Sequence, residues 1–240
     1  FIDFSFFTKK STSGDVESHF FSKTSRKLNF NNFDESTLNF ELQQASNDTY
    51  LKTYKVKSPI IKDTNLLSSF FEVSAYRDDL SFDTNFQVYE NLSVKGSDRY
   101  EVIYPSYDVI KNLSNPTDLN GNFSIYSSGY LKNYNTNVYD RVIINDFIFN
   151  SDALYTDEGF KNNYNILIKN INTDSDNSTK YKNSQDHKLA SIFEYNSSYP
   201  LKKTSANFND ILKPKMSLKY SPNNTKDMRN EDRRIDKNNI

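Results

Sequence analysis

Residues 64–92 read TNLLSSFFEVSAYRDDLSFDTNFQVYENL, and the fold of the chain can be inferred outward from this stretch. In its second half, a mostly apolar set alternates strictly with a polar set: Leu80, Phe82, Thr84, Phe86 and Val88 against Ser81, Asp83, Asn85 and Gln87. In its first half, one face likewise holds Leu67, Ser69, Phe71, Val73 and Ala75. Arg77, Asp78 and Asp79 mark the reversal between the halves. This period of two predicts an antiparallel hairpin of two long strands.

The length of the arms favours a strand that crosses a membrane. Each arm has about ten residues, whereas a strand of a soluble protein usually has about half that number. A tilted strand needs roughly 9 to 11 residues to cross a bilayer. We therefore expect the apolar set of residues 80–88 to meet lipid, and Asp83, Asn85 and Gln87 to line a wet lumen.

The composition is compatible with a barrel, although the chain looks polar as a whole. Its 240 residues are 35% hydrophobic, with a mean hydropathy of -0.79 and a net charge of -1. A barrel strand offers only every second residue to lipid, so no long apolar run is needed. The 19 Phe and 17 Tyr argue against disorder. The near-zero charge argues against a nucleic-acid partner, and the absence of Cys excludes disulfides and thiolate metal sites within the chain.

Amphipathic segments recur along the rest of the chain. They lie at residues 1–6, 18–30, 38–43, 99–113, 123–134, 138–149, 159–171, 189–199 and 212–220. Residues 45–63 are expected to form a long ordered connection, and residues 172–187 a polar surface loop. The count is about eleven strands without alternating helices. We predict an all-β, antiparallel up-and-down meander that is part of a large transmembrane β-barrel and forms an open curved sheet in this chain.

Residues 99–113 contain a proline in the middle of a predicted strand. A strict period of two places Tyr100, Val102 and Asp108 on one face of this strand. Pro105 cannot donate a hydrogen bond to a neighbouring strand, so it predicts a β-bulge or a local sheet edge.

The two ends of the chain suggest that it belongs to a longer protein. The alternation is already present at Phe1, and the chain stops at Ile240 within a charged segment. We expect residues 1–240 to be a single incomplete domain, an internal part of a barrel.

The sequence offers no catalytic constellation. His19 and His187 are far apart in sequence, and we interpret both as exposed polar residues. Asp78-Asp79 and Glu231-Asp232 are interpreted as solvated turn residues. No nucleophile elbow, phosphate-binding loop or zinc-binding helix motif is present. We therefore expect no enzyme activity, no cofactor, no metal, and no catalytic or cofactor-binding residues.

Several tyrosines lie near predicted strand ends, where barrels carry aromatic girdles at the membrane interfaces. They are Tyr50, Tyr54, Tyr104, Tyr107, Tyr130 and Tyr134. Packing inside a β-sandwich explains the same positions equally well.

Four phrases of the sequence carry a resemblance to a known family. They are FELQQASNDTYLKTY (40–54), DRYEVIYPSYDVIKNL (98–113), SSGYLKNYNTNVYDRVIINDFIF (127–149) and LKPKMSLKYSPNNTKDMRNEDRRID (212–236). The chain resembles the C-terminal barrel of the lipopolysaccharide (LPS)-assembly family, LptD, formerly called organic solvent tolerance proteins. The family pattern has an S-D-x-x-Y-type loop after a strand and two later prolines. Residues 46–50, Pro105 and Pro214 stand in these places in the same order.

The resemblance implies a cell outer-membrane location and a transport function. Members of the family insert LPS into the outer leaflet through a lateral opening of a very large barrel. They take the lipid from periplasmic bridge proteins, and a plug lipoprotein (LptE-like) occupies the lumen. The N-terminal periplasmic domain and the closing strands of the family are absent from this chain, so no gate residue can be assigned.

Two other classes remain open. One is a different outer-membrane barrel, either a porin or a plugged receptor, which residues 172–187 would suit as a long loop. The other is a secreted β-sheet structural or binding protein, a sandwich or fibre module, whose apolar faces would pack against each other in a soluble protein.

Overall fold

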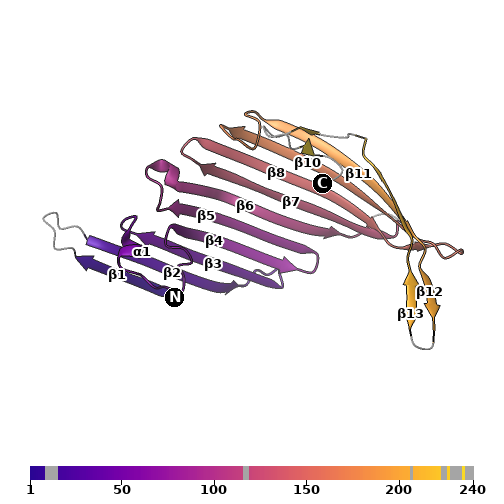
Figure 1. Ribbon diagram of the computed structural model, residues 1–240, viewed down its shortest axis with the longest axis horizontal. Coiled ribbons are helices and arrows are strands. Elements are labelled where there is room, and N and C mark those ends of the chain that lie inside the picture. The colour runs from indigo at the N-terminus through magenta and orange to yellow at the C-terminus, as the bar shows by residue number, and fades with distance from the viewer. Residues whose placement is uncertain (9–15, 116–118, 206–207, 223–225, 228–233, 236–240) are drawn as a thin grey trace.

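The chain folds into one antiparallel sheet, in which each strand pairs almost always with its neighbours in sequence (Figure 1). The computed structural model describes residues 1–8, 16–115, 119–205, 208–222, 226–227 and 234–235. The sheet has 12 strands in the order β1-β2-β3-β4-β5-β6-β7-β8-β10-β11-β14, and β9 pairs with β10 beside this path. The expected all-β, antiparallel up-and-down meander is confirmed, and the sheet is open, not closed into a barrel.

The first six strands include the hairpin predicted for residues 64–92. They are β1 (Ile2–Thr8), β2 (Val16–Leu28), β3 (Glu35–Ala45), β4 (Leu66–Arg77), β5 (Leu80–Asn91) and β6 (Tyr100–Leu113). A single 3₁₀ turn, η1 (Ser97–Arg99), precedes β6. The hairpin of β4 and β5 turns at residues 78–79, as predicted, and each arm has 12 residues.

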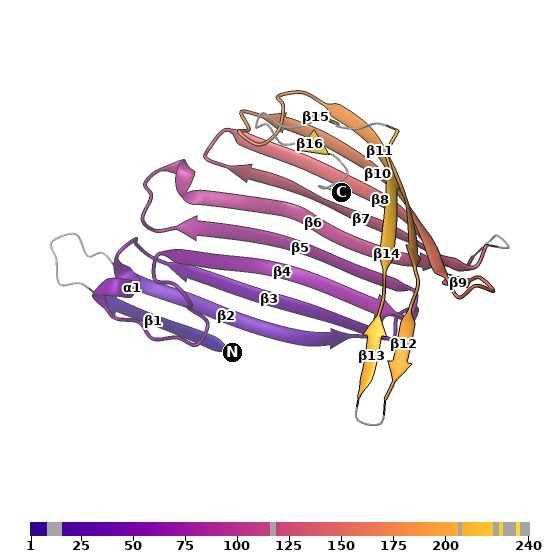
Figure 2. The ribbon, with the colours of Figure 1, turned by 45° about the vertical axis from the view of Figure 1, so that its right-hand side comes forward.

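The second half of the chain has longer strands and one side hairpin. The strands are β7 (Gly121–Tyr134), β8 (Val138–Ser151), β9 (Leu154–Tyr155), β10 (Lys161–Asp176), β11 (Asp186–Ser198), β12 (Leu201–Thr204), β13 (Asn209–Leu212) and β14 (Lys215–Tyr220). β12 and β13 pair only with each other and project from the sheet (Figure 2). The short strands β15 (Lys226–Asp227) and β16 (Arg234–Ile235) form a further pair.

The two ends of the sheet differ in their connections. The end at which residues 46–65, 92–99, 135–137 and 177–185 connect strands is called the helix end, because the one-turn helix α1 (Tyr50–Thr53) lies there. The opposite end, with the turn at 78–79 and the β12–β13 pair, is called the hairpin end.

The long connection is ordered, as predicted, and it contains the main apolar cluster. Tyr50, Leu51 and Ile60 of the connection are buried together with Phe21 of β2, Leu67 of β4 and Leu92. The helix α1 was not predicted. It has only four residues, so its apolar side chains, and not helix propensity, stabilise it.

Pro105 produces the predicted bulge. Asn85 pairs with Ser106 and Gln87 with Ile103, so Phe86 faces both Tyr104 and Pro105. The extra residue reverses the alternation of β6: Tyr107 and Val109 join the face of Thr84 and Phe82. The expectation that Tyr100 and Val102 share a face with Asp108 is therefore wrong.

Other boundaries also differ from the predicted ones. The polar loop expected at 172–187 is shorter, because β10 continues to Asp176 and β11 begins at Asp186. The strand expected at 212–220 is split between β13 and β14, and β9 was not predicted. The pair Glu231-Asp232, interpreted as solvated turn residues, lies outside the described residues.

Candidate functional surface

The two faces of the sheet are the first candidate for a functional surface. Cross-strand pairing places Phe40, Phe71 and Phe86 in one row, and Asn39, Glu72 and Asn85 in the adjacent row. Since neighbouring residues of a strand point to opposite sides, the two rows define two faces. We call them the apolar face and the polar face.

The apolar face carries large side chains that are exposed to the surroundings. The rings of Phe71 and Phe86 are edge to face, with their centroids 6.4 Å apart. Phe71 is 39% exposed, Phe86 46% and Val88 39%. Within the described residues, the 12-stranded sheet is one layer, and the separate pair β12–β13 does not pack on these three side chains. A patch of this kind marks a surface that meets an apolar partner.

The apolar residues of this face form a band that crosses the sheet diagonally. In β3 the band is centred on Phe40, between Leu38 and Leu42, and in β14 on Leu218, between Met216 and Tyr220. When the register of each strand pair is extended along the strands, the centre moves ten positions toward the hairpin end over eight strand-to-strand steps. This is about 1.25 residues per step, and with a rise of about 3.4 Å and a strand spacing of about 4.8 Å the band is inclined by roughly 40°.

Polar side chains lie beside the band on the same face. Phe82 and Val109 share a row with Ser127, Asn145 and Asn170. Ser127 Oγ donates to Asn145 Oδ1 at 2.7 Å, and Asn145 Nδ2 donates to Asn170 Oδ1 at 3.2 Å. The same row is thus apolar in β5 and β6 and polar in β7, β8 and β10, because the band has moved toward the hairpin end.

The polar face is crossed by hydrogen bonds between neighbouring strands. Ser25 Oγ donates to Asn39 Oδ1 at 2.7 Å, and Asn39 Nδ2 donates to Glu72 Oε1 at 2.9 Å. Asp83 and Asp108 are direct cross-strand partners. Such satisfied polar rows, with charge left over, are typical of a surface in contact with water.

The polar face changes character in the last strands. Ile148, Leu167 and Ile192 share one row there. Beside them Lys169 Nζ lies 2.7 Å from Asp146 Oδ2, and both side chains are about 85% buried. This part of the face is a mixed surface, which the alternation alone did not predict.

Charged groups at both ends of the sheet are paired. Asp79, at the turn of the central hairpin, accepts hydrogen bonds from Lys111 and from Arg77 Nε, and these cations lower the pKa of its carboxyl. At the helix end, Arg99 Nη2 lies 2.8 Å from Asp48 Oδ1 and 2.6 Å from Glu90 Oε1. Burial opposes the charge of Arg99, but the two carboxylates outweigh it and the pKa is raised. These ion pairs tie the connections to the strands.

The two histidines occupy different environments. His19 is buried, contrary to expectation, and its Nδ1 lies 3.2 Å from Tyr50 Oη and its Nε2 3.4 Å from Asp3 Oδ1. It fastens the long connection to β1 and β2. His187 is exposed, as expected, but it belongs to β11, where its Nδ1 lies 2.8 Å from Asn172 Oδ1. The structure does not bring the two histidines together.

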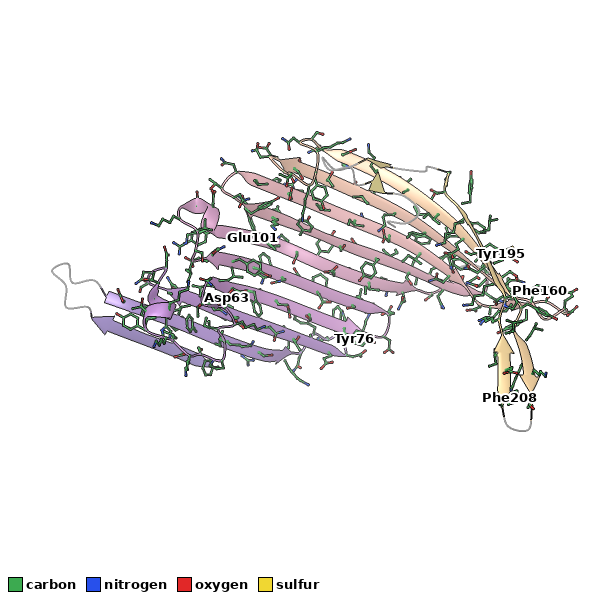
Figure 3. The ribbon with its side chains drawn as sticks, in the orientation of Figure 1. Asp63, Tyr76, Glu101, Phe160, Tyr195 and Phe208 are labelled. Atoms are coloured by element: carbon green, nitrogen blue, oxygen red, sulfur yellow. The ribbon has the colours of Figure 1, made fainter. Side chains whose placement is uncertain are left out.

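The expected tyrosine girdle is only partly compatible with the structure. Tyr50 is fully buried, so its assignment to a membrane interface is wrong. Tyr130 and Tyr134 lie on the polar face and bond to Tyr181 and Asp140. Exposed aromatic side chains that were not predicted for this role lie at the hairpin end, among them Tyr76 and Phe160 (Figure 3).

Two further kinds of site were sought within the part of the chain that the structure describes: a metal centre and a membrane-spanning helix. Among the described residues, no three His, Asp or Glu side chains are arranged to hold a metal ion. In the same part of the chain, no helix is long and apolar enough to cross a membrane.

A scan against models of protein families and a search of curated proteins found no match to this chain. Its function is therefore inferred from the sheet, its two faces and the resemblance described above.

Proposed function

We propose that this chain is part of an outer-membrane barrel that inserts LPS into the outer leaflet of the outer membrane. The observation that carries the proposal is the diagonal apolar band. Strands of transmembrane barrels are tilted by about 35–45°, so the lipid-facing residues of successive strands must be displaced along the sheet. The inclination of roughly 40° has the size that this tilt requires.

The opposite face supplies the second surface that this function needs. Rows such as Ser25, Asn39 and Glu72 give a wet lining along which a sugar-rich lipid headgroup can pass. No bond has to be made or broken in such a barrel, and we propose no catalytic residue. The resemblance adds a plug lipoprotein and periplasmic bridge proteins as partners.

The open edges of the sheet fit a barrel wall better than an independent soluble domain. In the described residues, β1 and β14 each have one unpaired side. An unpaired edge in a bilayer leaves backbone groups without partners, so further strands must close the sheet. A secreted sandwich would bury the apolar face against a second layer of the same chain, whereas the 12 strands of the main sheet form a single layer and Phe71, Phe86 and Val88 stay exposed.

Fractionation tests the membrane part of the proposal. The gene that encodes this chain is expressed in a Gram-negative host, and the outer-membrane fraction is run on SDS gels with and without boiling. We expect a band in the outer-membrane fraction that migrates differently when unboiled. A soluble protein without a shift would refute the barrel and favour a secreted β-sheet protein.

Depletion then tests the transport part. Loss of the protein from its natural host is expected to reduce LPS at the cell surface while other outer-membrane barrels remain. Unchanged surface LPS together with loss of solute uptake would identify a porin or a plugged receptor instead.

A further inference from the structure

A basic pocket lies on the polar face at the hairpin end, where β10, β11 and β14 run side by side. Lys161, Ser198 and Lys215 are cross-strand partners in one row. Asn163, Asn196 and Ser217, two residues away along each strand, form the next row on the same face. Lys213, from the connection between β13 and β14, completes a pocket of about 370 Å³. Tyr199 N donates to Pro214 O at 3.1 Å and holds this connection against the end of β11.

The charge of this pocket is not balanced by acidic side chains. Elsewhere in the sheet, basic residues of the strands lie within 4.0 Å of carboxylates: Lys23 with Glu41, Lys111 with Asp79, Lys132 with Glu101, Arg141 with Asp174, Lys169 with Asp146 and Lys219 with Glu194. Among the described residues, Lys161, Lys213 and Lys215 have no such ion pair, and none of the described residues that line the pocket is acidic. Three like charges thus lie together without a carboxylate partner in the described part of the chain, unlike the six basic side chains named above.

The nearby carboxylate does not neutralise the pocket. Glu194 lies two residues from Asn196 in β11, on the same face. Its Oε1 accepts a hydrogen bond from Ser217 Oγ at 3.1 Å, and its Oε2 lies 3.7 Å from Lys219 Nζ. Glu194 is therefore engaged by other donors.

We propose that the pocket binds a phosphate group. Lysine ammonium groups are good partners for phosphate, and the amides of Asn163 and Asn196 add neutral donors beside them. The pocket combines these donors without an acceptor-only side chain that would repel an anion. The basic lining of the pocket, without an acidic side chain among its described residues, supports phosphate as the ligand. That the phosphate belongs to a lipid moving along the polar face rests on the proposed function.

A titration of the full-length protein folded in detergent micelles tests the proposal. The probes are inorganic phosphate and short-chain phosphatidic acid below its micelle concentration, and binding is followed by calorimetry. The pocket variant is K161Q/K213Q/K215Q. The control variant K27Q/K52Q/K95Q removes three exposed lysines that do not line the pocket, so the net charge changes equally.

We expect the wild type to bind at least one of the two probes, and the pocket variant to bind it at least about tenfold more weakly, as the loss of one charge-assisted hydrogen bond would give. The control variant should stay within about twofold of the wild type, and K161R/K213R/K215R should retain binding. Binding of both probes indicates that phosphate alone suffices, and binding of phosphatidic acid only indicates a lipid source.

No binding of either probe by the wild type, or equal weakening by the pocket and control variants, would overturn the site. Heat-modifiable migration measured on the same preparations reports barrel formation separately. Probe binding and gel migration therefore test the two proposals separately: the phosphate site can be refuted without refuting the barrel, and the barrel without refuting the phosphate site.

Discussion

Placing a lysine at Phe82 is the most direct test of which face meets lipid. Phe82 lies on the apolar face between Ala75 and Val109, and the midline of the diagonal band crosses β5 between Phe82 and Thr84. A charged side chain near the midplane of a bilayer costs about 2 to 4 kcal/mol in a transmembrane barrel. We expect Phe82→Lys to lower the free energy of unfolding by that amount.

The matched control is Ser81→Lys, one residue away in the same strand and on the polar face. Its depth is nearly the same, but its side chain would meet water, so we expect a cost below about 1 kcal/mol. Both variants are folded into phospholipid vesicles and titrated with guanidinium, with the folded fraction read from unboiled SDS gels. Equal costs for the two lysines would refute the assignment of the faces.

Three further predictions follow from the register, the packing and the charges. Val73 and Asn172 share a row, but Val73 lies near the midline of the inclined band and Asn172 about 14 Å from it, at the edge of the apolar zone. Val73→Lys should therefore lower the free energy of unfolding by about 2 to 4 kcal/mol, and Asn172→Lys by at most about 1 kcal/mol. Equal losses in the guanidinium titration would contradict the inclination of the band. A Cβ at Gly129 would lie 2.7 Å from the ring of Tyr107, so Gly129→Ala should destabilise the protein by about 1 to 3 kcal/mol, measured as a lower unfolding midpoint. Because the pKa of Asp79 is lowered in the folded protein, its carboxylate stabilises the fold above its ordinary pKa of 3.8, and this contribution is lost as the pH falls through the lower folded value. Asp79→Asn should remove this acid-dependent loss from the profile of unfolding free energy against pH. An unchanged profile would argue against the ion pairs.

The strands were predictable where one face is apolar and the other is not. Leu80 to Val88 alternate so strictly that the period of two outweighs the low mean hydropathy. The alternation failed at Pro105, since a bulge changes which residues share a face without changing the sequence period. It also failed at the ends of β10 and β11, where Asn172 to Asp176 look like a loop but are held by pairing with β8.

The candidate surfaces were less predictable than the strands. The inclined band depends on the register of every strand pair, and register is set by contacts between strands. The basic pocket joins Lys161 with Lys213 and Lys215, which lie about fifty residues further along the chain. Of these three lysines, only Lys213 and Lys215 are close in sequence. The burial of His19 depends on Tyr50 of the connection, and nothing in the sequence near His19 indicates it.

The order of the strands has a consequence for how the chain acquires its structure. Nearly every strand pairs with the one before and the one after it, so most contacts between strands join consecutive elements. The connections between consecutive strands are mostly short, so little loop entropy is lost before each new pairing is gained. The sheet can therefore grow by one hairpin at a time, with each added strand covering the bare edge left by the last. Only the joining of the first strand of a barrel to its last would have to wait for the whole chain.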